Sequence, residues 1–377
     1  MGAFVIAAAA WMYGYFTGGT EILPLVPEVI PGTARVESSG ELYLGFDEAG
    51  DLIGYAATGD AQGYCGPIEM LVGVDPAGEI LGVKVIEHCE SPGFFRLVEN
   101  QGYLDQFSGT SLSDPLSLGN DLDSVSGATL SAEGIAGSVR IAVREIAREG
   151  LEDPLPPERK RIKFGWPEIS LLALYGAGYI GHKTRGPWKK RIRWGTLLTG
   201  MVVIGFIYTA PLTIAQIISL LSGYWPDWQS NLYWYILLGG IVFITTVDAK
   251  NPYCSWFCPF GAFQETLAQI TSAPIYKPRK WRSAFTWLQR GLAFGALVLG
   301  LALRNPGVAG FEPFATLFDL RGTTIQWVFL IVVTLASLVM YRPFCNYLCP
   351  IDPAVDVIAE VRSLVLEGWK KWRKPKQ

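Results

Sequence analysis

Hydrophobic residues follow two different patterns along the chain, and these separate an N-terminal part from a C-terminal part. Between residues 33 and 152, short apolar stretches alternate with polar turns, which is typical of half-buried strands. Two hairpins are predicted, at residues 41–57 and 70–86, because each contains a central turn with Asp and Gly. Apolar residues at helical spacing predict an amphipathic helix over residues 131–148. We therefore predict a compact α+β domain in residues 33–152.

The C-terminal part contains apolar stretches that approach the length needed to cross a bilayer. The chain also starts with an apolar stretch, residues 1–16, which lacks the basic start of a signal peptide; we expect an anchor, with a cleaved signal as the alternative. We expect linkers at residues 17–32 and 153–165, and an α-helical five-span membrane domain over residues 166–341. Its expected spans are residues 166–180, 196–221, 232–247, 285–303 and 325–340.

The charges between these stretches predict an orientation in the membrane. The loops at residues 182–193 and 250–282 and the C-terminal tail are rich in Lys and Arg, whereas the loops at 223–231 and 304–324 are poor in them. Basic loops stay in the cytoplasm. We therefore expect about six spans in the cell membrane, with both termini and the basic loops in the cytoplasm and the α+β domain outside. Because the basic residues lie beside spans, the sequence favours contact with membrane lipid and no nucleic-acid partner.

Composition agrees with this architecture. Half of the residues are hydrophobic, only 17% are charged, and the mean hydropathy is +0.27. The chain has two histidines, His88 and His182, and His88 lies outside every expected span. The sequence therefore argues against a membrane cytochrome b, which holds each haem between two axial histidines.

A stretch of small and polar residues precedes the predicted helix of the α+β domain. It reads Asp-Ser-Val-Ser-Gly-Ala-Thr and ends at Thr129. At a helix start, free backbone N–H groups and the helix dipole favour a phosphate, and small residues allow close approach. The Thr129 hydroxyl can form a phosphoester. The same residues also suit an ordinary helix cap, and the residues alone leave both interpretations open.

This stretch resembles the flavinylation motif of the FMN-binding domains in the Rnf and Na⁺-pumping NADH:quinone reductase complexes. The resemblance implies that a flavin transferase attaches FMN to Thr129 through a phosphoester and recognises Asp123. The segment from His88 to Gly93 is similar to a segment that lies beside the flavin in that family, with Ser in place of Thr. The implied FMN-binding residues are Thr129, Asp123, Ser126, Gly127, Ala128, Ser131, His88, Glu90, Ser91, Pro92 and Gly93.

The other candidate chemistry lies in two cysteine arms, at residues 251–259 and within residues 342–377. Both contain Cys-x3-Cys-Pro, and the second copy follows the first by 91 residues, which indicates an internal duplication. The spacing matches part of a bacterial ferredoxin motif, and the cytosol keeps thiols reduced. We expect one iron–sulfur cluster, of the 4Fe-4S type, with a four-cysteine zinc site or two separate dithiols as alternatives. The expected ligands are Cys254, Cys258, Cys345 and Cys349.

Two further cysteines, Cys65 and Cys89, belong to the domain that is expected outside. Oxidising conditions there permit a disulfide. Two buried thiols and a redox role beside the flavin are the alternatives, and the sequence leaves all three open.

The order of domain, spans and cysteine arms resembles the NosR/PceC-type membrane flavoproteins, which are associated with nitrous oxide and organohalide respiration. The chain looks like a shorter form, in which a basic amphipathic tail stands where NosR-type proteins have a ferredoxin domain. The resemblance implies electron transfer between a quinone pool or cytoplasmic donor and an extracytoplasmic reductase or other electron-transfer protein. A quinone, another cofactor or a partner would have to bridge a core about 30 Å thick. A regulatory or maturation factor and a component of an ion-translocating Rnf-like complex are the alternatives.

Overall fold

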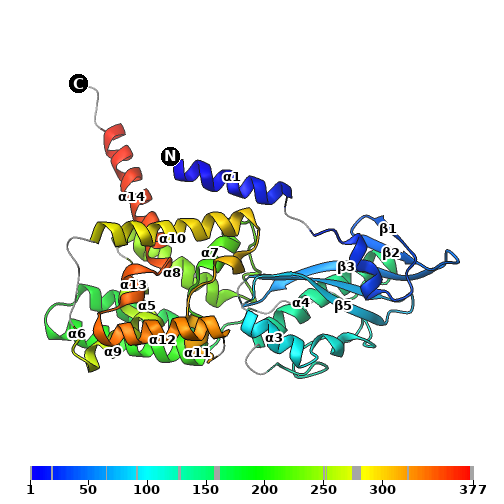
Figure 1. Cartoon of the computed structure of the whole chain (residues 1–377), viewed down its shortest axis with the longest axis horizontal. Coiled ribbons are helices and arrows are strands. Elements are labelled where there is room, and N and C mark those ends of the chain that lie inside the picture. The colour runs from blue at the N-terminus through cyan, green and yellow to red at the C-terminus, as the bar shows by residue number, and fades with distance from the viewer. Residues whose placement is uncertain are drawn as a thin grey trace. The chain divides into compact units, whose positions relative to one another are not determined.

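A computed structural model describes residues 2–17, 20–64, 66–90, 92–125, 129–156, 162–248, 251, 253–273, 282–320 and 322–373 (Figure 1). The chain forms two compact units. The first comprises Met1–Arg159, Ala215–Pro226 and Val298–Gly310, and the second comprises Lys160–Ile214, Asp227–Leu297 and Phe311–Gln377. The sheet-containing domain therefore lies within the first unit, which also includes two short segments from the C-terminal part.

The first unit contains a five-stranded antiparallel sheet in which each strand pairs with the next one in sequence. Both predicted hairpins are confirmed, and backbone hydrogen bonds close their turns between Asp47 and Asp51 and between Asp75 and Glu79. The first strand was not predicted, since it is polar and mostly exposed. The strands are β1 Arg35–Ser39, β2 Leu42–Phe46, β3 Leu52–Gln62, β4 Pro67–Val74 and β5 Ile80–His88.

Helix α4, Thr129–Glu145, covers one face of this sheet and confirms the predicted amphipathic helix (Figure 1). The main core lies between them and includes Met70 and Val72 from the sheet and Ile135 and Val139 from the helix. A smaller core on the other face packs around the short helix α2. The remaining helices of this unit are α1 Gly2–Thr17, η1 Leu23–Leu25, α2 Val26–Val29, α3 Pro92–Asn100, η2 Leu104–Phe107, η3 Ile146–Gly150 and η6 Pro306–Ala309.

The second unit contains helices and, among its described residues, no strand. Two helices, α7 Ile214–Leu221 and α10 Arg282–Ala302, contribute residues to both units. The others are α5 Trp166–Lys183, α6 Pro187–Gly200, η4 Met201–Ile207, α8 Leu232–Asp248, η5 Tyr253–Phe257, α9 Pro259–Ile270, α11 Phe314–Phe318, α12 Thr324–Val339, α13 Pro343–Tyr347 and α14 Ile351–Arg373.

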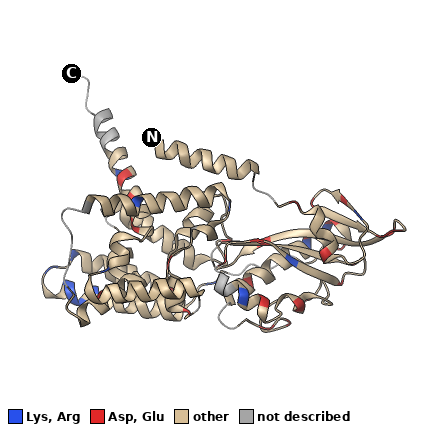
Figure 2. Ribbon diagram, viewed as in Figure 1, with Lys and Arg blue, Asp and Glu red and all other residues tan. Residues whose placement is uncertain are grey.

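One helix among the described residues is long and apolar enough to cross a membrane, over Ser283–Ala302, with a mean hydropathy of 1.3. Three shorter apolar helices occur at Gly2–Thr17, Leu232–Val247 and Thr324–Val339. In Figure 2, α12 is free of charged residues along its length. The structure thus gives one clear span candidate, and the count of six spans stays a prediction.

One expected span differs in the structure. The stretch 196–221 was expected to be a single helix, but its helical structure stops at Ile207 and resumes at Ile214. Thr209 has a φ of 45°, in the left-handed region, and Pro211 has no backbone N–H to donate. Helical hydrogen bonding therefore cannot continue through this point, although the apolar pattern does.

Candidate functional site

The two segments that carry the flavin resemblance meet in the structure. The Ser131 hydroxyl donates a hydrogen bond of 2.7 Å to a carboxylate oxygen of Glu90, although 41 residues separate them in sequence. Ser131 is 1% exposed and Glu90 is 4% exposed. A buried carboxylate is costly unless it is hydrogen-bonded, so this contact fixes the segment after β5 against the first turn of α4.

Glycines bring α4 close enough to the sheet for this contact. A Cβ on Gly134 would lie 2.9 Å from the Gly63 Cα, and a Cβ on Gly137 would lie 2.9 Å from the Ala61 Cβ. On the strand side, a Cβ on Gly59 would collide with the carbonyl oxygen of a residue on α4. Larger residues at these positions would push the helix away from β3, and the first turn of α4 would move with it.

Thr129 is the first residue of α4 and is exposed. The first backbone N–H groups of a helix have no partner within the helix, so a phosphate on this residue would find donors beside it. The backbone N–H of Asp123 donates to the Gln106 side chain at 2.8 Å, while Asp123 itself is exposed. Pro92 and Gly93 begin α3. The candidates that lie outside the described residues are Ser91, Ser126, Gly127 and Ala128.

His88 lies in the same region, at the end of β5. Its ring stacks on Phe95 with a centroid distance of 3.7 Å and an interplanar angle of 13°. Burial lowers the pKa of His88, and the Nδ1 atom has no hydrogen-bond partner among the described residues. The imidazole is therefore neutral near pH 7, with one buried ring nitrogen available to a ligand.

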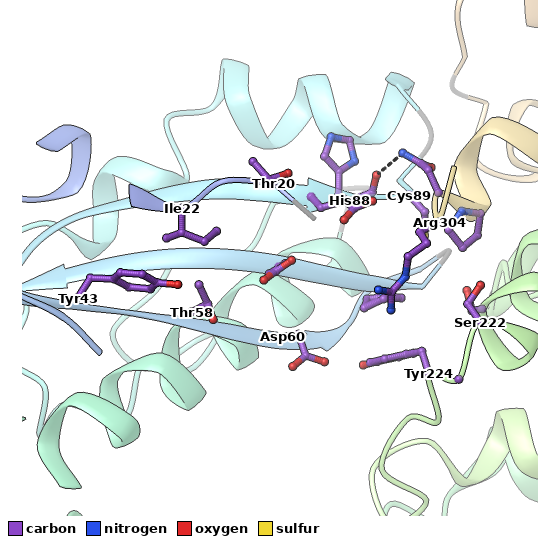
Figure 3. A pocket seen from close by; sticks show the side chains of 17 residues that line it. Thr20, Ile22, Tyr43, Thr58, Asp60, His88, Cys89, Ser222, Tyr224 and Arg304 are labelled. Atoms are coloured by element: carbon purple, nitrogen blue, oxygen red, sulfur yellow. Dashed lines mark hydrogen bonds between the residues drawn. The ribbon is translucent and has the colours of Figure 1, made fainter. Parts of the chain in front are cut away.

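A cavity of about 520 Å³ lies within the first unit and reaches the sheet face opposite α4 (Figure 3). Asp60, Glu69 and Glu87 line it and are direct cross-strand neighbours on β3, β4 and β5. Burial, followed by the charges of Glu87 and Asp60, raises the pKa of Glu69. The charge of Arg304, which also lines the cavity, opposes this shift (Figure 3). Asn305 donates to the His88 carbonyl oxygen at 3.5 Å.

The cysteine arms lie in the second unit, where buried side chains of neighbouring helices contact them. Cys258 and Cys349 are each followed by a proline and a helix, α9 in the first arm and α14 in the second. The Gln264 side chain, fully buried on α9, donates from Nε2 to the Cys345 Sγ at 3.2 Å. Gln289 on α10 donates to the carbonyl oxygens of Cys345 and Cys349 at 3.0 and 2.9 Å.

The four thiols influence one another. Burial, followed by the charges of Cys345 and Cys258, raises the pKa of Cys349 well above its usual value. Burial, followed by the charge of Cys258, raises the pKa of Cys345 to about 12. Burial and the charges of the other cysteines also raise the pKa of Cys254, and the charge of Asp352 adds to this rise. Such thiols stay protonated unless a cation replaces the protons, which is how metal ligands behave. Within the described part of the chain, no group of three or more His, Cys, Asp or Glu side chains is already arranged to hold a metal ion.

A buried arginine beside the thiols suits an anionic centre. Arg342 has a φ of 49° and a ψ of 58°, a left-handed conformation that is costly for a residue other than glycine. Its Nη1 donates to the Cys254 carbonyl oxygen at 3.1 Å, and its buried Nε has no hydrogen-bond partner among the described residues. A cluster held by four thiolates is negatively charged, so the donor set and this guanidinium fit such a group.

An ion triad holds that arginine in place. Glu265 is 2% exposed, receives two hydrogen bonds from Arg193 at 2.6 and 2.7 Å, and pairs with Arg342. Burial alone would raise the pKa of Glu265, but hydrogen bonds from Arg193 and the charge of Arg342 outweigh it and lower the pKa. The sequence pattern did not single out these residues, nor Gln264 and Gln289, because none of them belongs to a recognised spacing motif.

Two family models match the chain. The FMN-binding domain model matches residues 63–144, and the 4Fe-4S binding domain model matches residues 230–281 and again residues 325–375. The first match contains both segments of the candidate flavin site. The second model matches each cysteine arm separately, which supports the predicted internal duplication.

Three relatives share parts of the chain. NirI of Paracoccus denitrificans is 26% identical over 211 residues, which are 52% of this chain and 30% of NirI. Regulatory protein NosR of Pseudomonas aeruginosa is 27% identical over 201 residues, which are 49% of this chain and 27% of NosR. One protein of the ion-translocating oxidoreductase complex of Methanosarcina acetivorans is 30% identical over 139 residues, which are 34% of this chain and 74% of that protein.

The sheet domain, the paired cysteine arms and these matches define a flavin-binding and 4Fe-4S electron-transfer protein. The chain is homologous to NirI, to NosR and to the matching component of the Rnf complex, and it belongs to the family of FMN-binding proteins that this component represents. The aligned part spans less than a third of the length of NirI and NosR.

Proposed function

We propose that this chain is a multi-pass membrane flavoprotein that carries covalent FMN outside the cytoplasm and one 4Fe-4S cluster at the cytoplasmic side. It passes electrons between a quinone pool or cytoplasmic donor and an extracytoplasmic respiratory reductase. The observation that carries this proposal is the pairing of two candidate centres on one chain. The first turn of α4 is held against Glu90, and both cysteine arms, with buried or partly buried thiols, match a 4Fe-4S binding domain.

The flavin half of the proposal rests on the first turn of α4. FMN supplies one- and two-electron chemistry when it is bound. Thr129 would carry its phosphate after a flavin transferase recognises the stretch that begins at Asp123. Glu90, held by Ser131, keeps the segment after β5 against the helix, and His88 offers a neutral, half-buried ring beside it.

The cluster half rests on the second unit. A 4Fe-4S cluster supplies one-electron transfer when it is bound. The four thiols that would hold it are buried or partly buried, which limits access of water and oxidants. Arg342 would offset part of the negative charge, and Glu265 keeps that guanidinium in place. The four proposed ligands are Cys254, Cys258, Cys345 and Cys349.

Contacts within the first unit support the proposed orientation. Asn305 contacts the His88 carbonyl oxygen, and Ala215 packs in one small cluster with Cys89 and Tyr64. In the proposed topology, Asn305 lies in a loop outside the cytoplasm, on the same side as the sheet domain. Cys65 lies outside the described residues, so a disulfide with Cys89 stays one of the three alternatives.

Anoxic purification of the full chain in detergent tests both halves together. We expect covalent flavin that fluoresces on a denaturing gel, and about four irons with about four acid-labile sulfides per chain. The Thr129→Ala variant should lose the fluorescent band but retain iron, whereas Cys345→Ser should lose iron but retain the band. A wild type without covalent flavin, or with zinc in place of iron and sulfide, would contradict the corresponding half.

A regulatory role is the second candidate, because one relative is described as a regulatory protein. Both roles need the same centres and differ in what they act on. Electron delivery to a purified reductase, measured with the wild type and the Thr129→Ala variant, separates them. Equal delivery by both proteins, together with loss of the reductase transcript in cells that carry the variant, would favour the regulatory role.

A further inference from the structure

Gln264 makes a direct hydrogen bond to a candidate cluster ligand. Its side chain lies on α9, is fully buried, and reaches the second cysteine arm. The Oε1 atom accepts the backbone N–H of Phe344 at 3.0 Å, and the Nε2 atom lies 3.2 Å from the Cys345 Sγ. Because a backbone N–H can only donate, it fixes the amide oxygen on its own side and turns the amide N–H toward the sulfur.

The internal duplication shows that this contact is particular to the second arm. In the first arm, the Tyr253 hydroxyl accepts the backbone N–H of Leu212 at 3.0 Å. The duplicated position in the second arm is Phe344, which has no hydroxyl. The residue that corresponds to Gln264 on α14 is Val355, which has no side-chain donor. The second arm therefore receives a side-chain donor to one sulfur from the helix that follows the first arm, and the duplicated position offers no such donor to the first arm.

We propose that Gln264 is a positioning residue that raises the reduction potential of an iron–sulfur cluster bound by Cys345. The inference rests on the proposed function, which supplies the cluster. An N–H group directed at a ligand sulfur stabilises the form with more negative charge, and this is the reduced form. Burial strengthens the effect, because the low local dielectric leaves little solvent to screen it.

A neighbouring glutamine provides a matched control. Gln289 is also buried, at 7% exposed, and its amide also faces the second arm, but it donates to two backbone carbonyl oxygens. Replacing Gln289 with Leu removes the same chemical group without removing a hydrogen bond to sulfur. A potential that depends on general polarity would shift in both variants, whereas a potential that depends on the N–H···S contact would shift mainly at Gln264.

The test is a redox titration of the anoxic full chain, followed by the EPR signal of the reduced cluster. Gln264→Leu is expected to lower the equilibrium constant for reduction about tenfold, which corresponds to a shift of about 59 mV to more negative potential. Gln264→Met keeps a long, flexible side chain but has no N–H for the sulfur, so it should shift the potential in the same direction. Gln289→Leu should stay within about twofold of the wild type.

A measurement on the wild type covers the case in which the Gln264 variants assemble no cluster. Glutamine labelled with ¹⁵N in the side-chain amide should change the nitrogen modulation in pulsed EPR of the reduced cluster, because Nε2 of Gln264 contacts a ligand sulfur. The same change in labelled Gln289→Leu shows that the signal does not come from Gln289. Unchanged modulation overturns the inference, as do Gln264 variant potentials within about twofold of the wild type. A wild type without any iron–sulfur signal contradicts the proposed function instead.

Discussion

Glu265→Gln tests the network that supports the cysteine arms. Glu265 is almost completely buried and balances two arginines, Arg193 through two hydrogen bonds and Arg342 through an ion pair. The glutamine side chain has nearly the same shape, so packing is preserved. It accepts a hydrogen bond from one arginine but carries no charge, which leaves both guanidinium groups without that counter-charge.

The expected loss of stability is large. Removing one partner of a buried ion pair costs about 3–5 kcal/mol, and we take about 3 kcal/mol because one hydrogen bond persists. For a unit of this size, that loss lowers the unfolding midpoint by about 6–12 °C. The pKa of Glu265 is lowered in the folded chain, so its contribution is present above the unfolded pKa and is lost as the pH falls through the folded pKa. The difference in unfolding midpoint between Glu265→Gln and the wild type should therefore become smaller at acidic pH.

The assay is thermal unfolding in one detergent at a fixed scan rate, followed by circular dichroism. The matched control is Glu360→Gln, which removes an ion pair of 3.1 Å to Arg290; the two side chains are 61% and 45% exposed. An exposed pair contributes about 0–1 kcal/mol, so this control should shift the midpoint by about 4 °C or less. Equal midpoints for the two variants would refute the argument that the triad supports the arms.

Two further changes test the first unit. Glu69→Gln removes the middle one of three neighbouring carboxylates, Asp60, Glu69 and Glu87. Chemical unfolding at pH 8 should show a gain in stability of about 0.5 kcal/mol, which is small because water screens part of the repulsion. The pKa of Glu69 is raised in the folded chain, so its charge costs stability once the pH rises above its unfolded pKa. The gain from Glu69→Gln should therefore vanish at about pH 4. A gain that is the same at every pH would contradict the argument from charge repulsion. Ser131→Ala removes the buried donor to Glu90 and should lower the free energy of unfolding by about 1–3 kcal/mol. The control, Ser111→Ala at an exposed turn, should change the free energy of unfolding by less than about 0.5 kcal/mol. Equal losses in the two variants would contradict the assigned contact.

The sequence predicted the parts of the fold that repeat a simple pattern. Both hairpins and α4 follow from alternating or helical apolar spacing between turn residues, and the structure confirms them. Strand β1 was not predicted, because its residues are polar and it forms only through antiparallel pairing with β2. The break in the helix before Ile214 was not predicted, because an apolar sequence pattern does not reveal the left-handed backbone conformation of Thr209.

In the candidate site too, some residues could be predicted from the sequence and others could not. Residues within contiguous motifs, such as Thr129 and the four cysteines, could be named from spacing. Gln264 could not, because it reaches Phe344, 80 residues away in sequence, only after the chain has folded. Asn251 and Arg342 occupy duplicated positions, and a comparison of the two copies is the signal that could have singled out the arginine.

The most direct test of the central claim is mass spectrometry of the tryptic peptide that contains Thr129. Trypsin cleaves after Arg96 and Arg140, with no Lys or Arg between them, so one peptide contains the complete motif. Covalent flavinylation predicts that this peptide, taken from membranes of the native host, is heavier by the mass of FMN less one water, and that fragmentation assigns the added mass to Thr129. An unmodified peptide as the only form, in cells that contain an active flavin transferase, would contradict it.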